Sequence, residues 1–190
     1  LILLGAIGFC GLLAEGAVAD WSAVYLDSSL TTSPALAAAG FAAFSLTMTI
    51  GRLVGDRLAQ AWGPVVVTRR GGVLAGGGLG VALLLNHPAA AVVGFACVGA
   101  GLAAIVPVIF SSAGRLPSVA PGPAIAAVSV AGYTGFLVGP PLIGLTAEVI
   151  GLPLALGLVA LLCGGIVALA PCVAPSVPTR VGASGLPAAP

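Results

Sequence analysis

Residues 88–111 read PAAAVVGFACVGAGLAAIVPVIFS, a run without a single charged side chain. A helix of about 20 apolar residues is long enough to cross the hydrocarbon core of a bilayer. The whole chain has this character, because 59% of its 190 residues are hydrophobic and only 6% are charged. Six basic and five acidic side chains are too few to cover a soluble globule, and intrinsic disorder requires low hydrophobicity. We therefore expect a polytopic membrane protein.

Six apolar stretches of suitable length follow one another along the chain and are joined by short connections. Transmembrane β-strands would alternate polar and apolar residues, which these stretches do not. The expected fold class is therefore an all-α membrane protein with six transmembrane helices. The remaining segment, residues 173–190, is rich in proline and small residues and is expected to be a disordered cytoplasmic tail. The expected spans are residues 1–25, 34–54, 64–85, 88–111, 123–147 and 152–172.

The arginines predict the orientation in the membrane, because basic residues concentrate on the cytoplasmic side. All six flank the second-to-third connection, lie in the fourth-to-fifth connection or belong to the tail. With six spans, these three places lie on the same side of the membrane. Asp27 and Glu148 lie near the connections on the other side. We expect a multi-pass protein of the inner or plasma membrane with both ends of the chain cytoplasmic. The arginines are Arg52, Arg57, Arg69, Arg70, Arg115 and Arg180.

The composition excludes several kinds of chemistry. Without lysine, the chain can form neither a Walker A phosphate loop nor a lysine Schiff base. The single histidine, His87, and four separated cysteines offer no set of metal ligands, so no metal or cofactor is expected. Nucleic acid, which requires clustered basic residues, is not an expected partner. The chain starts at Leu1 within an apolar run, which we interpret as a fragment that opens inside a span.

Glycines and prolines inside the spans indicate close packing and bends. Gly135 and Gly139, four residues apart, allow two helices to approach closely in lipid. Pro107, Pro140 and Pro141 also lie within spans, where proline removes a backbone donor and bends a helix. These prolines are candidate hinges, and static kinks explain them equally well.

The sequence GRLVGDRLAQAWG, residues 51–63, closes the second span. Arg52 and Asp56 are spaced i, i+4 and can pair on one helix face. Asp56 could also face the positive N-terminal end of the span that begins near Pro123. A solvated loop rich in positive charge is the alternative interpretation.

This stretch resembles the cytoplasmic loop signature of the major facilitator superfamily, which links the second and third spans of each six-span half. The resemblance implies that Asp56 docks on a neighbouring helix and stabilises one access state, with Arg57 bridging nearby. The residues that carry it are Gly51, Arg52, Gly55, Asp56, Arg57 and Gly63.

Two further stretches resemble one half of that fold. Residues 14–26, AEGAVADWSAVYL, are similar to the seventh span of the fucose-permease-like bacterial branch, and residues 135–144, GFLVGPPLIG, are similar to the eleventh. The resemblance implies the C-terminal half of a twelve-helix major facilitator fold. The implied partners are the missing N-terminal six-span half of the same chain, the lipid bilayer and a small-molecule substrate.

Acidic residues inside the first span are the leading candidates for function. At 1.5 Å per residue, Glu15 lies about 18 Å inward from Asp27, near the middle of the bilayer. An ionised acid costs about 2.5–3.5 kcal/mol there, and all six arginines are expected near the cytoplasmic side. With no cation expected at this depth, Glu15 is the candidate proton carrier; the alternative is a neutral Glu15 that binds a neighbouring helix. The other candidates for a substrate or proton pathway are Asp20, Ser22, Tyr133 and Thr134.

Together these features favour secondary active transport of a small solute by alternating access with proton coupling. Enzymatic activity is not expected. One alternative is a non-transporting scaffold or regulator built from half a transporter. Another is an intramembrane enzyme, which is disfavoured because the GxSG spelling at residues 182–185 lies in the polar tail and His87 lies in an outer turn.

Overall fold

The computed structural model describes residues 1–174, which are helical and contain no strand. Val173, expected in a disordered tail, is buried and ends a 3₁₀ turn, while the rest of that predicted tail from residue 175, with Arg180, lies outside the described residues. The elements are α1 (Ile2–Val24), the π-helical turn η1 (Tyr25–Ser29), α2 (Pro34–Trp62), α3 (Pro64–Leu85), α4 (Pro88–Leu102), α5 (Ile105–Ala113), α6 (Pro121–Ile150), α7 (Leu152–Leu169) and the 3₁₀ turn η2 (Ala170–Val173).

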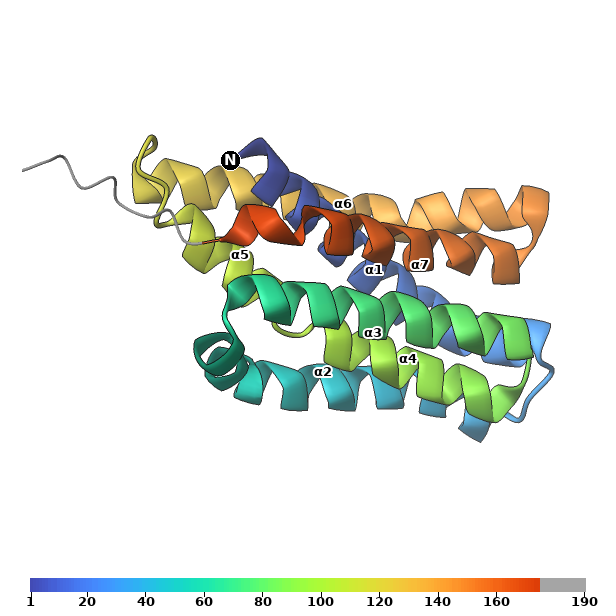
Figure 1. The fold of residues 1–190 in the computed structure, drawn as a ribbon. Coiled ribbons are helices and arrows are strands. Elements are labelled where there is room, and N and C mark those ends of the chain that lie inside the picture. The colour runs from blue at the N-terminus through green and yellow to red at the C-terminus, as the bar shows by residue number, and fades with distance from the viewer. Residues whose placement is uncertain (175–190) are drawn as a thin grey trace, which may run out of the picture.

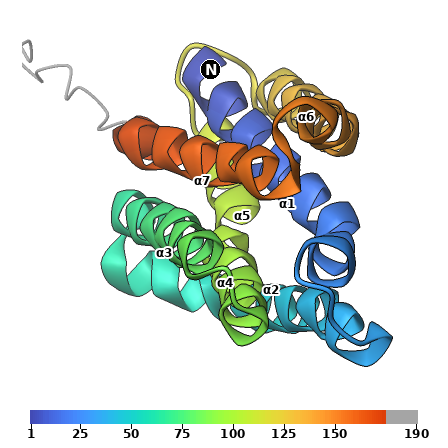
Figure 2. The same cartoon turned by 90° about the vertical axis from the view of Figure 1, so that its right-hand side faces the viewer.

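The long helices run side by side along one direction and form two groups (Figure 1). An end-on view shows α1, α6 and α7 in one group, α2, α3 and α4 in the other, and α5 between them (Figure 2). The groups meet where α3 contacts α7 and where α1 contacts α2. The N-terminus, the α2–α3 connection and the end of α7 all lie at the same end of the bundle.

Several helices start at a proline, which is favoured in the first turn because its missing N–H would be unpaired there. The side chain of Ser33 accepts a hydrogen bond from the Leu36 amide before α2, and His87 accepts one from the Ala89 amide before α4. Gly63, with φ of 82°, lets α3 start directly after α2, in a conformation that disfavours a side chain. α2 therefore continues to Trp62, past residue 54, where the sequence predicts its end.

Within residues 1–174, five helical segments are long and apolar enough to cross a membrane, against the six predicted. α3 is not among them, because Arg69, Arg70 and a run of glycines lower its mean hydropathy. It is nevertheless a 22-residue helix that packs along α4 and α7. The five segments are Ile2–Ser29, Pro34–Trp62, Pro88–Ala113, Pro121–Ile150 and Leu152–Val173.

The fourth predicted span is interrupted, since α4 ends at Leu102 and α5 begins at Ile105. Pro107 follows in the first turn of α5. A proline has no N–H to donate to the carbonyl four residues earlier, here Ala103, and its ring clashes with that carbonyl. The break at 103–104 is therefore where the effect of Pro107 is expected, whereas Pro140 and Pro141 lie inside an unbroken α6.

α1 and α6 pack almost backbone to backbone. A Cβ atom at Gly139 would lie 2.6 Å from the carbonyl oxygen of Leu13, and one at Gly135 would collide with the carbonyl of Phe9. Only glycine allows this approach, so the predicted role of this glycine pair in close helix packing is confirmed. α1 has its most extensive contact with α6.

Candidate functional site

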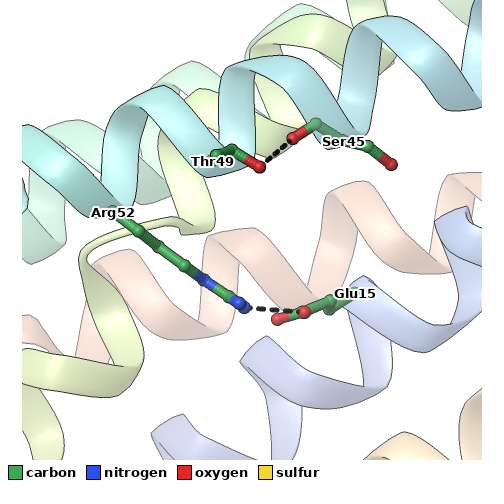
Figure 3. Close-up of polar contacts among 4 residues, drawn as sticks. All are labelled: Glu15, Ser45, Thr49 and Arg52. Carbon is green, nitrogen blue, oxygen red and sulfur yellow. Dashed lines mark hydrogen bonds and ion pairs between the residues drawn. The ribbon is translucent and has the colours of Figure 1, made fainter.

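An ion pair connects the two helix groups. The guanidinium of Arg52, on α2, donates a hydrogen bond to Oε1 of Glu15, on α1, at 2.8 Å (Figure 3). The exposed fractions of the side chains are 49% for Arg52 and 18% for Glu15. Within residues 1–174, this is the only ion pair in the structure. The carboxylate predicted to lie deepest in the bilayer therefore has a cationic partner.

This pairing corrects two predictions. The prediction that no cation lies at the depth of Glu15 is wrong. Because α2 extends to Trp62, Arg52 lies about 15 Å before the end of that helix, at 1.5 Å per residue. The long aliphatic stem of arginine also carries its charge far from its own backbone. The i, i+4 pair of Arg52 with Asp56 does not form either, since the guanidinium reaches α1 instead and Asp56 remains exposed.

Two hydroxyl residues that were not predicted from the sequence share the Arg52 side of α2. Ser45, Thr49 and Arg52 are spaced by four and three residues, which places them on one helix face. The Thr49 hydroxyl donates to the Ser45 carbonyl at 2.8 Å, and Figure 3 shows both residues on the side of α2 that faces α1. Polar residues at helical spacing within an apolar span are the signal that could have identified them.

Asp20 lies in a different part of the structure from the Glu15–Arg52 ion pair. It lines a groove of about 530 Å³ between α1 and α6, together with Trp21, Pro140 and Glu148. The indole Nε1 of Trp21 donates to the carbonyl oxygen of Pro140 at 2.9 Å and holds α1 against the proline-containing part of α6. The structure thus separates Asp20 from the Glu15–Arg52 pair, although both acids lie in α1.

Ser22 lies in the protein core. Its side chain is completely buried and, among the described residues, its hydroxyl has no hydrogen-bond partner. A Cβ atom at Gly40 would contact its carbonyl oxygen at 3.5 Å, so this part of α1 packs tightly on α2. Ser22 therefore lines an interhelical contact in this structure.

Tyr133 and Thr134 lie on an exposed face of α6, where the exposed fraction of Tyr133 is 64%. The Thr134 hydroxyl donates to the Val130 carbonyl at 2.8 Å, within its own helix. In the part of the chain that the structure describes, neither residue makes a hydrogen bond to Glu15.

Two glycines of the loop signature, Gly51 and Gly55, bring the C-terminal half of α2 against the α4–α5 break. A Cβ at Gly51 would lie 2.5 Å from that of Ala103, and one at Gly55 would lie 3.3 Å from that of Ala104. Close contact at the break thus depends on these two glycines.

Asp56 lines a pocket of about 350 Å³ with Pro107 of α5 and Arg115 of the following connection. No residue of α6 lines this pocket, and the placement of Asp56 at the start of that span stays a prediction. Arg57 is exposed and has no ion-pair partner among residues 1–174. Its predicted bridging contact is therefore not formed in this structure.

The chain is similar to several membrane proteins, although no family model matches it. It is 40% identical over 156 residues to membrane protein MosC of Rhizobium meliloti, covering 82% of this chain and 38% of that protein. It is 38% identical over 161 residues to an uncharacterised MFS-type transporter of Yersinia pestis, covering 85% and 42%. It is 37% identical over 171 residues to an uncharacterised transporter of Sinorhizobium fredii, covering 90% and 45%.

A solved structure has the same helical arrangement. The crystal structure of a peptide transporter POT, a glutamate-to-glutamine mutant in complex with alafosfalin, superimposes with a TM-score of 0.79 at 17% identity. The match covers 90% of this chain and 37% of that one, and at this identity the likeness concerns the fold alone. The chain spans less than half the length of these curated relatives and of the solved structure.

Proposed function

Because the chain belongs to the major facilitator superfamily, we propose that it forms the C-terminal six-helix half of a secondary active transporter. The transporter would move a small solute across the inner or plasma membrane by alternating access, with both ends of this segment cytoplasmic. Relatives named as transporters support this proposal, as do helices apolar enough to cross a membrane. The N-terminal half of the same protein would supply the other wall of the solute site.

The observation that carries the mechanistic part of the proposal is the Glu15–Arg52 ion pair. Charges deep in a membrane persist where they have a partner or line a cavity, and they often mark ion pathways. This pair connects α1 and α2, which belong to different helix groups (Figure 2). A proton bound to the Glu15 carboxylate would cancel its charge and release the guanidinium. Proton binding would thereby weaken one link between the two groups of helices.

In this scheme the pair couples the proton gradient to the rearrangement of the helices. With Glu15 deprotonated, the ion pair holds α1 to α2. With Glu15 protonated, Arg52 keeps its charge and is free to interact with the solute or with the other half of the protein. Ser45 and Thr49, on the same side of α2, would offer hydroxyl groups to a polar solute. Tyr133 and Thr134, exposed on α6, are further candidates for the solute path.

The test uses the full-length protein. A thermal-shift screen with a panel of sugars, dipeptides and organic cations selects a solute, whose uptake is then measured in proteoliposomes with an imposed pH gradient. We expect Glu15→Gln to lose accumulation driven by the gradient while retaining exchange of labelled for unlabelled solute. Glu148→Gln, the same substitution at an exposed acid, should retain both activities.

The two parts of the proposal fail in different ways. Gradient-driven accumulation that is unchanged in Glu15→Gln would exclude the coupling role and leave transport intact. If the unmodified protein neither takes up nor exchanges any of the solutes that stabilise it, that result would contradict transport itself.

A further inference from the structure

A narrow groove separates α2 from α3 and α4 near the end of the bundle that carries the arginines. Its volume is about 130 Å³, and its walls include Leu58 of α2, Leu74 of α3 and Ala100 of α4. Glycine backbone forms part of the lining at Gly71 and Gly101, where α3 and α4 cross so closely that neither position has room for a Cβ atom. Apart from Trp62 and Arg70, the residues that line the groove are glycines or have aliphatic side chains.

The groove opens beside a paired cation and aromatic ring. The guanidinium of Arg70 lies over the indole of Trp62, 5.0 Å from the ring centroid. Both residues line the groove and both are exposed. Among residues 1–174, no acidic residue lines it, in contrast to the neighbouring pocket that holds Asp56. The groove thus combines an apolar floor with an unopposed positive charge.

The position of this pair suits the boundary between lipid headgroups and acyl chains. Trp62 is the last residue of α2, and Arg70 lies in the second turn of α3. Tryptophan is enriched at this boundary, and arginine there extends its charge toward the headgroups. Leu74, one turn deeper than Arg70, has an exposed fraction of 45% and continues the apolar surface toward the hydrocarbon core.

We infer that this groove is a binding site for an anionic phospholipid. The phosphate of the headgroup is held by Arg70, with Arg69 adjacent, and a segment of one acyl chain lies over Gly71 and Gly101 between Trp62 and Leu74. Positive charge beside a gap between transmembrane helices is the arrangement that recognises anionic headgroups. A zwitterionic lipid would fill the same groove without a net charge to match Arg70.

Quenching of Trp62 fluorescence by brominated lipid tests this inference. The full-length protein is placed in nanodiscs that contain either brominated phosphatidylglycerol or brominated phosphatidylcholine at the same mole fraction, and the share of Trp62 is obtained by comparison with Trp62→Phe. We expect about fivefold preference for phosphatidylglycerol, since a basic residue at an anionic surface contributes about 1 kcal/mol, and 1.36 kcal/mol corresponds to tenfold.

Three variants separate charge recognition from general lipid contact. Arg70→Gln should lose the preference, whereas Arg70→Lys should keep most of it. Arg115→Gln removes the same charge from another pocket at the same end of the bundle and should leave the preference unchanged. Ala100→Leu, at an exposed position in the groove wall, should lower quenching by phosphatidylglycerol while the protein stays folded.

Several results would overturn the inference. Equal quenching by the two lipids in the unmodified protein would show that the groove does not select for charge. Absence of quenching by either lipid would show that another part of the full-length protein covers the groove. A preference that survives Arg70→Gln but disappears in Arg115→Gln would place the anionic lipid elsewhere.

Discussion

The Glu15–Arg52 pair should make the two side chains energetically interdependent. An exposed ion pair contributes about 0.2–1 kcal/mol to stability, whereas loss of one partner from a buried pair costs about 3–5 kcal/mol. Arg52 is 49% exposed and Glu15 is 18% exposed, which places this pair between the two cases. We therefore expect Arg52→Gln to lower the free energy of unfolding by about 1–2 kcal/mol, because it leaves the carboxylate unpaired.

A double-mutant cycle measures the interaction itself. Unfolding of the full-length protein in micelles is followed for the unmodified protein, Glu15→Gln, Arg52→Gln and the double variant. The double variant should be more stable than the sum of the single effects predicts, by about 1 kcal/mol, since the second substitution removes a charge already unpaired. Glu148→Gln combined with Arg115→Gln serves as the control, because these exposed residues form no ion pair in residues 1–174.

Additivity would refute the reasoning. If the effects of the Glu15 and Arg52 substitutions add to within about 0.5 kcal/mol, as for independent sites, the 2.8 Å contact contributes nothing. Equal coupling in the control pair would show that the assay reports total charge.

Three further predictions concern packing and topology. Gly71→Ala should destabilise the protein by about 1–3 kcal/mol through overpacking against α4. Gly77 has open space around it, so Gly77→Ala should be neutral or stabilising by up to about 1 kcal/mol. Equal melting temperatures of the two variants would contradict this prediction. Trp21→Phe removes the hydrogen bond to α6 and should cost about 1 kcal/mol, measured by thermal unfolding. Single cysteines in a cysteine-free background should be labelled by impermeant reagent from outside at Ser28 and from the cytoplasm at Arg115, and the reverse pattern would refute the orientation.

The family and the helical character of the chain could be predicted from the sequence because both depend on local patterns. Apolar runs of span length are visible without tertiary structure, and the spacing of residues 51–63 is itself the signature. The predicted family is supported by a relative named as an MFS-type transporter, which is 38% identical over 85% of this chain. The exact length of α2 was harder to predict, because Gly63 permits an abrupt corner instead of an earlier end of the helix.

The candidate site was only partly predictable. Glu15 could be singled out from its depth along one helix, but its partner depended on how two helices lie against each other. Counting residues from a helix end treats arginine as a charge at its own backbone, whereas the Arg52 side chain spans the gap to α1. Burial of Ser22 likewise depends on the close approach of Gly40, a contact that no spacing rule within α1 contains.

The extensive packing of α1 against α6 has a consequence for the time course of synthesis. About 100 residues separate the end of α1 from Pro121, where α6 begins. At a synthesis rate of about 5–20 residues per second, α6 starts to be made about 5–20 s after α1 is complete. Arg52 follows Glu15 by 37 residues and is made about 2–7 s after it. Photocrosslinking of nascent chains stalled before Pro121 would test whether the ion pair is formed by then. If it is, the ion pair protects the charge of Glu15 during assembly, before α6 with Gly135 and Gly139 has been made.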